Sequence, residues 1–196
     1  MQDFSIWLQL GFTHILDING YDHLLFLLVL TAPYTWKQSK SLFWLITAFT
    51  LGHSLSLALS TLGFVHLKSV WIELFIAITI LLTAIQNLWS LGSNQTLAWH
   101  LMYGITTFFG LIHGLGFSGT LRSLLGSGSQ IILPLLAFNI GLELGQILWV
   151  LLLLLLSLIL ISLIKLPNKY STIAFSSLGI LLSGKMIYER ILPFTT

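Results

Sequence analysis

Long apolar runs separated by short polar connections fill almost the whole chain. A membrane-spanning helix needs about 20 predominantly apolar residues. Runs of this length predict five spanning helices, over about residues 41–62, 69–91, 96–117, 134–156 and 171–192. The fourth is expected to end in a glycine-dense segment, followed by a loop rich in glycine and serine.

The first span is short of apolar residues. Its purely apolar run covers only residues 24–32, so the crossing must also include the polar stretch from about His14 onward. This inclusion places Asp22 and His23 near the middle of the membrane. Asn19-Gly20 predicts a break or kink inside the span, because this pair favours turns.

The remaining N-terminal residues, 4–13, are apolar but too few to cross, which predicts an interfacial or partly inserted helix. We therefore expect an all-α polytopic bundle of six transmembrane helices, or seven if the N-terminal segment inserts. Composition agrees, with 56% hydrophobic residues, 7% charged residues and a mean hydropathy of +0.96. Residues 1–196 are expected to form a single integral membrane domain, since six spans leave no room for a soluble one.

Net charge and cysteine content limit which macromolecules and which metal ions the protein is expected to bind. A net charge of +2 with no run of basic residues excludes nucleic acid as an expected partner. The absence of cysteine leaves imidazole, carboxylate, amide and carbonyl groups as metal ligands, which suit nickel, cobalt and zinc better than copper(I). The positive-inside rule predicts both termini outside, because the basic residues of the connections divide into Lys37, Lys40, Lys165 and Lys169 on one side and Lys68 and Arg122 on the other.

Ionisable residues inside the predicted spans fall in one layer. Counted from one membrane face, Glu73 lies about one turn deep, His113 within about two turns, and His53, Glu143 and His23 near the middle. A charged residue facing lipid at mid-depth costs about 2.5 to 3.5 kcal/mol. Gathered into one pocket, carboxylates and imidazoles neutralise one another or share a divalent cation. The layer therefore predicts a polar site.

Each of these residues also has a structural interpretation. A single membrane histidine is often a hydrogen-bond partner between helices. Glu73 could cap a helix or interact with its dipole, and Asp17 could cap a turn. The stripe of Asn139, Glu143 and Gln146 could join two helices by hydrogen bonds. Their joint occurrence in one layer favours the functional interpretation.

The chain contains a weak internal repeat. TAFTLGHSL at 47–55 aligns with TFFGLIHGL at 107–115, and each segment precedes a span that carries one glutamate. An offset of two spans preserves orientation, so this pattern would be a parallel repeat.

In order along the chain, HILDINGYDHLLFLL, TAFTLGHSLSLAL, VWIELFIAITI, FGLIHGLGFSG and LLAFNIGLELGQ resemble the HupE/UreJ family. These hydrogenase- and urease-associated proteins are regarded as nickel or cobalt permeases of the bacterial plasma membrane. The resemblance covers about residues 11–150 and implies transport of Ni²⁺, or alternatively Co²⁺ or Zn²⁺. It also implies contact with membrane lipid and with metalloenzyme maturation proteins. The metal-site residues it implies are His14, Asp22, His23, His53, Glu73, His113, Asn139 and Glu143.

Two other functions remain open. The protein could be a metal-binding membrane sensor or an assembly factor for a metalloenzyme. The segment Gly116-Phe117-Ser118-Gly119 also matches a motif of rhomboid-type intramembrane serine proteases. Such an enzyme needs a histidine beside the serine, and no histidine follows His113 in the chain. We therefore expect no enzymatic activity.

Overall fold

In the computed structural model, residues 4–93, 99–125 and 131–192 are described. Every regular element in this part of the chain is a helix, as the sequence predicts. The elements are α1 (Phe4–Leu16), α2 (Asp22–Thr31), the short 3-10 helix η1 (Trp36–Gln38), α3 (Ser39–Thr61), α4 (Ser69–Ser93), α5 (Trp99–Leu125), α6 (Ile132–Ser162) and α7 (Asn168–Ile191).

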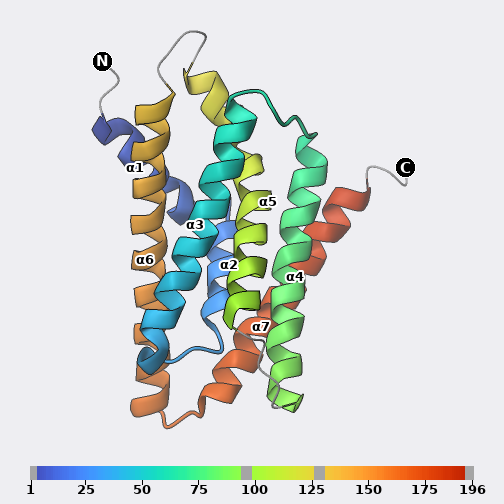
Figure 1. The fold of residues 1–196 in the computed structure, drawn as a ribbon. Coiled ribbons are helices and arrows are strands. Elements are labelled where there is room, and N and C mark those ends of the chain that lie inside the picture. Colours follow the sequence, from blue (N-terminus) through green and yellow to red (C-terminus); the bar gives the residue numbers. More distant parts are fainter. Residues whose placement is uncertain (1–3, 94–98, 126–130, 193–196) are drawn as a thin grey trace.

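The first crossing is made by two short helices in succession (Figure 1). α1 has 13 residues and α2 has 10, so neither crosses a membrane alone. The turn between them contains Asn19 and Gly20, which confirms the predicted break. Asp17 stabilises this turn because its Oδ1 accepts hydrogen bonds from the backbone N and Nδ2 of Asn19, at 2.9 and 3.1 Å.

Four other helices, α3 to α6, are long and apolar enough to cross a membrane. α7 is long enough, but it is more polar and does not belong to that group. α1 begins and α7 ends at the same end of the bundle (Figure 1), as an even number of crossings requires. Which end faces outside stays a prediction.

The fourth predicted span was placed too short. α5 continues past Phe117 to Leu125, through residues expected to form a loop. Glycine lowers helix propensity by about 1 kcal/mol, but packing of α5 along α3 offsets this cost. The part of the expected loop at 126–130 lies outside the described residues.

α3 and α5 run in the same direction and touch backbone to backbone (Figure 1). A Cβ on Gly52 would overlap the carbonyl oxygen of Thr107, and one on Gly110 would overlap that of Phe49. Only glycine allows so close an approach. The contact fixes the two histidine-bearing segments of the repeat against each other, as a parallel repeat would require.

α1 and α6 form a second pair of the same kind. A Cβ on Gly11 would overlap the carbonyl oxygen of Phe138, and one on Gly141 would overlap that of Leu8. α1 therefore packs along α6 through one buried face, and this contact with a long apolar helix agrees with a partly inserted helix.

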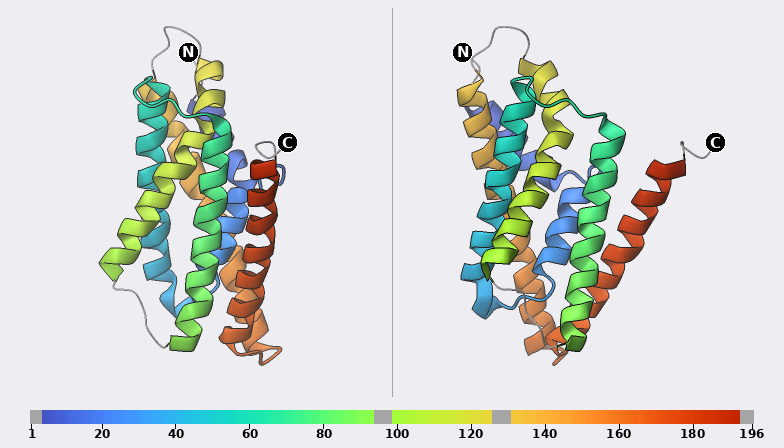
Figure 2. Two further views of the ribbon diagram at one scale, coloured as in Figure 1. Left: turned by 90° about the vertical axis from the view of Figure 1, so that its right-hand side faces the viewer. Right: turned by 45° about the vertical axis from the view of Figure 1, so that its right-hand side comes forward.

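Side chains from three neighbouring helices hold α2 in place. They donate hydrogen bonds to backbone carbonyls of α2 or of the residue that follows it. Trp149 of α6 donates to Leu24, Asn87 of α4 to Val29, and Thr172 of α7 to Ala32, at 3.2, 2.8 and 2.9 Å. Two of these bonds satisfy the carbonyls that a helix leaves free at its C-terminal end. α7 also packs along α4, which it crosses at an angle (Figure 2).

Candidate metal centre

Four histidines from four different helices meet near the break between α1 and α2. His14 lies in the last turn of α1 and His23 in the first turn of α2, and His53 and His113 come from the paired helices α3 and α5. Ring centroids lie 4.9 Å apart for His14–His23, 5.1 Å for His23–His113 and 5.8 Å for His23–His53. We call these four residues the histidine cluster. His53 and His113 are fully buried and His23 is almost so.

Five ring nitrogens of the histidine cluster are buried without a hydrogen-bond partner among the described residues. An unsatisfied buried polar group costs about 1 to 3 kcal/mol. One nitrogen each from His14, His23 and His53 lies within 4.8 Å of the other two. Two nitrogens that share one transition-metal ion are at most about 4.2 Å apart, so a small contraction would bring these three onto one ion. The unpartnered atoms are Nε2 of His14, Nε2 of His23, Nδ1 and Nε2 of His53, and Nδ1 of His113.

Asp22 fixes the tautomer of His23. Its Oδ1 lies 3.1 Å from Nδ1 of His23 and also accepts the backbone N–H of that residue at 2.9 Å. An ionised carboxylate only accepts hydrogen bonds, so Nδ1 carries the hydrogen and Nε2 keeps its lone pair. A carboxylate in this position orients a metal-binding imidazole and raises its basicity. Asp22 therefore orients the His23 ring through Nδ1 and leaves Nε2 free for a metal ion.

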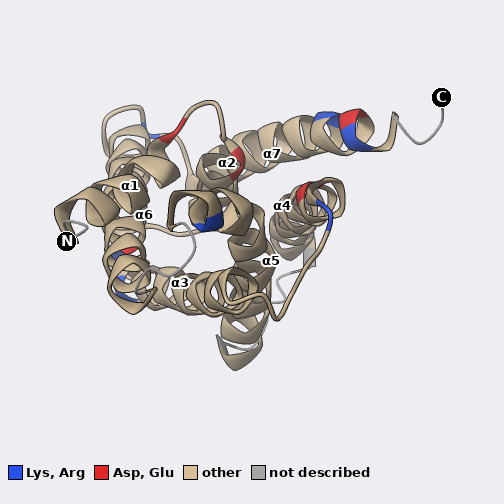
Figure 3. Ribbon diagram, turned by 90° about the horizontal axis from the view of Figure 1, so that it is seen from above, with Lys and Arg blue, Asp and Glu red and all other residues tan. Residues whose placement is uncertain are grey.

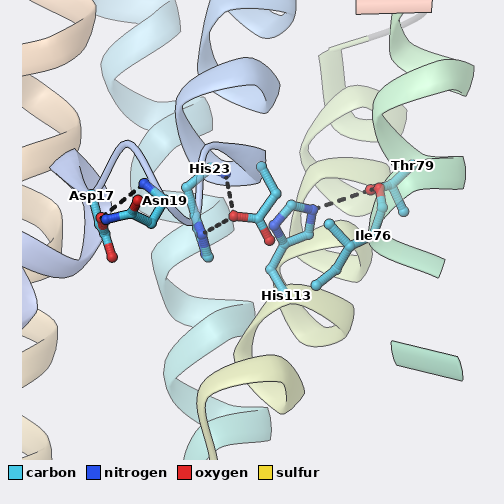
Figure 4. Close-up of polar contacts among 7 residues, drawn as sticks. Asp17, Asn19, His23, Ile76, Thr79 and His113 are labelled. Carbon is cyan, nitrogen blue, oxygen red and sulfur yellow. Dashed lines mark hydrogen bonds and ion pairs between the residues drawn. The ribbon is translucent and has the colours of Figure 1, made fainter. Parts of the chain in front are cut away.

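Thr79 of α4 does the same for His113 (Figure 4). Its hydroxyl donates to the carbonyl of Ile76 at 2.7 Å and lies 3.1 Å from Nε2 of His113. A hydroxyl has a single hydrogen, so when that hydrogen is given to Ile76, the oxygen accepts the Nε2–H of His113. This geometry assigns the lone pair of His113 to Nδ1, its unpartnered atom.

Aromatic rings enclose the histidine cluster. Phe26 and Phe49, both fully buried, stack at 4.9 Å, and each lies 5.1 Å from the His113 ring. Phe117 packs against His14 at 4.2 Å. The imidazoles thus stand in an apolar surrounding that offers few competing hydrogen bonds.

The comparison with known families agrees with this arrangement. The sequence model of the family described as "HupE / UreJ protein" matches residues 1–189. The chain belongs to the HupE/UreJ family. This family is associated with nickel and cobalt transport, so a HupE/UreJ protein is a membrane protein that handles metal ions. No curated protein and no solved structure matches the chain.

In this HupE/UreJ protein, Glu73 lies beside the histidine cluster but not in it. Glu73 lines the same cavity as His14, His23 and His113. Its Oε2 forms an ion pair with Nε of Arg190 at 2.6 Å, and its Oε1 accepts the hydroxyl of Ser69 at 2.6 Å.

The two predicted ligands on α6 make their hydrogen bonds outside the histidine cluster. Glu143 accepts a hydrogen bond from the hydroxyl of Thr47 at 2.7 Å, and Asn139 donates to the carbonyl of Leu135 at 2.8 Å. The Thr47–Glu143 bond and a 2.7 Å bond from Thr50 to Gln146 join α6 to α3, whereas the Asn139 bond lies within α6. That Asn139 and Glu143 bind the metal stays a prediction. Asn139 has a free atom for it, because its Oδ1 has no hydrogen-bond partner among the described residues.

Sequence reasoning missed Thr79 and Arg190. A threonine inside an apolar helix usually bonds its own backbone, so the sequence alone gave no sign that Thr79 faces a histidine. Arg190 lies at the end of the last predicted span, so it was not considered when the depths of ionisable residues in the membrane were compared.

Ser118, the residue of the protease alternative, has no base beside it among the described residues. Its hydroxyl donates to the carbonyl of Leu115 at 2.8 Å and accepts a hydrogen bond from Ser60 at 2.8 Å. Nε2 of His113, the nearest histidine before it in the chain, bonds to Thr79 instead. These contacts are those of a packing serine.

Proposed function

We propose that this protein is a permease for a divalent transition-metal ion, with Ni²⁺ as the first candidate and Co²⁺ as the second. The observation that carries the proposal is the gathering of four imidazoles at a helix break, three of which offer one nitrogen each within 4.8 Å of the other two. Neutral imidazole is a ligand of choice for nickel, cobalt and zinc. Broken helices are where many membrane transporters place their ion sites.

The route begins at the turn between α1 and α2. A hydrated ion meets Asp17 and His14 there, both of which line cavities at this turn. It exchanges its water for the nitrogens of His14, His23 and His53, with Nδ1 of His113 at the far side. Asp22 supplies negative charge behind His23, which lowers the cost of a cation in the membrane interior.

Location and orientation belong to the same proposal. We place the protein in the plasma membrane of a bacterium, with both termini outside. The cavity beside the histidine cluster would then face outside, since Glu73 and α7's C-terminal end line it.

Uptake of radioactive nickel by cells or vesicles tests the proposal. The His23→Ala, His53→Ala double variant should lose uptake, because two of the three closest ligands are removed. His66→Ala is the matched control, since His66 lies outside the cluster and bonds to Arg122 at 3.1 Å. Equal uptake by wild type and the double variant would refute the permease.

A static site is the second candidate, and the enclosure of the histidine cluster by Phe26 and Phe49 favours it. A sensor or an assembly factor would bind nickel tightly in a fixed ratio and show no flux. Measuring binding by purified protein together with uptake by vesicles separates the two functions. Binding without uptake would support the sensor or assembly factor.

A further inference from the structure

A cavity of 440 Å³ connects the surface with the histidine cluster. It lies between the α1–α2 turn, α4, α5 and α7. At one end Glu73 and Arg190 are partly exposed, with 36% and 43% of their side chains accessible. At the other end are the buried rings of His23 and His113. The lining of the cavity therefore includes both partly exposed charged side chains and buried imidazoles.

Acidic residues concentrate along this cavity. The chain has six acidic residues, and four line the cavity: Asp17, Asp22, Glu73 and Glu189. Among the described residues that line it, Arg190 is the one lysine or arginine. Figure 3 shows basic and acidic positions next to each other near the C-terminal end of α7. Negative potential in such a cleft concentrates cations.

Arg190 is bound to the carboxylate that lies at the exposed end of the cavity. With Nε of Arg190 at 2.6 Å from one oxygen and the Ser69 hydroxyl at 2.6 Å from the other, both oxygens of Glu73 are engaged. A metal ion that uses Glu73 must first displace the guanidinium.

We propose that Arg190 is a selectivity residue, a tethered cation that competes with incoming ions for Glu73. The inference rests on the proposed permease function. Attraction to a carboxylate scales with the charge of the ion, so a divalent ion displaces the guanidinium more readily than Na⁺ or K⁺ does. A transition-metal ion can then pass on to the imidazole nitrogens, which alkali ions bind poorly.

The competing explanation is structural, because the same ion pair joins α4 to α7. The two explanations predict opposite signs. Loss of a structural link weakens the fold and the metal site with it, whereas loss of a competitor strengthens metal binding. The gain in nickel affinity should also depend on Glu73. Once residue 73 is neutral, Arg190 and the metal ion no longer compete for its charge.

Calorimetric titration of nickel into the purified full-length protein, with and without excess K⁺, tests the inference. Arg190→Gln should bind nickel about two- to fivefold more tightly, as expected for release of a partly exposed ion pair. Its nickel binding should also become sensitive to K⁺. Arg190→Lys keeps a cation and should behave as wild type.

The control is Lys185→Gln, which removes one positive charge from the same helix but breaks only the 3.5 Å pair with Glu189. It should leave nickel affinity unchanged. In a Glu73→Gln background, Arg190→Gln should have no further effect, a non-additivity that marks direct coupling.

Several results would overturn the inference. These are unchanged or weaker binding by Arg190→Gln, the same gain in the Glu73→Gln background, or unfolding of Arg190→Gln while Arg190→Lys stays folded. They leave the permease proposal standing as long as the wild type binds and transports nickel. A wild type that binds no nickel would overturn both.

Discussion

Thr79→Val tests the assignment of His113 Nδ1 as a ligand atom. Valine keeps the branched shape of threonine but lacks the hydroxyl that accepts the Nε2–H of His113 at 3.1 Å. Both residues are buried, with Thr79 2% and His113 0% exposed, so water cannot replace the lost acceptor. The substitution changes one hydrogen bond in the surroundings of the histidine cluster.

The expected magnitude follows from this geometry. A buried imidazole N–H without an acceptor costs about 1 to 3 kcal/mol. His113 can avoid part of this cost by moving its hydrogen to Nδ1, but the nitrogen that faces the metal then has no lone pair. Loss of a group that orients a metal ligand typically costs about 10- to 100-fold in affinity, or about 1.4 to 2.7 kcal/mol. We expect Thr79→Val to weaken nickel binding within this range.

Nickel titration and nitrogen NMR of labelled histidine measure the two consequences. Wild type should hold the hydrogen of His113 on Nε2, and Thr79→Val should show a mixture of tautomers. Thr79→Ser retains the hydroxyl and should bind as wild type. Thr83→Val is the matched control, because within the described part of the chain its hydroxyl bonds only to the carbonyl of Thr79, at 2.8 Å. If Thr79→Val binds nickel as wild type does, or Thr83→Val loses as much, the reasoning fails.

Three further predictions concern packing, protonation and catalysis. Gly114→Ala should lower the melting temperature in detergent, since its Cβ would overlap the carbonyl oxygen of His53 and overpacking costs about 1 to 3 kcal/mol; Gly104→Ala, with open space around it, should not. Nickel affinity should fall as the pH is lowered, and binding should release protons, because only neutral imidazole has a lone pair for the metal; affinity independent of pH would argue against a histidine site. Ser118→Ala should leave nickel uptake unchanged, and wild type should not react with a fluorophosphonate; labelling of Ser118 would revive the protease.

The helices and the histidine layer could be predicted because both depend on distance along the chain. Apolar length fixes where a helix can cross, and helical rise converts residue number into depth. His53 and His113 could thus be placed at similar depth before their helices were known to touch. The break at Asn19-Gly20 could also be predicted, because the residues that favour a turn lie next to one another in the sequence.

Contacts that depend on the rotation of a helix about its axis could not be predicted. Depth alone places Glu143 beside the histidines, but its side chain faces Thr47 on α3. Thr79 carries no signal of its own until α4 is packed against α5. The prediction that the fourth span ends at Phe117 was wrong for a related reason, because burial of Leu121 and Leu125 against the bundle stabilises the extra turns of α5.

The two sides of the histidine cluster differ in a way that would constrain the proposed transport. One side meets the acidic cavity, and the other is closed by the stacked rings of Phe26 and Phe49. A cation cannot cross this apolar barrier without losing its ligands, so passage requires the barrier to move. Glycine contacts lock α3, which carries Phe49, against α5, whereas Phe26 belongs to the ten-residue helix α2. In the proposed transport, we therefore expect the Phe26 ring to be the part of the barrier that moves.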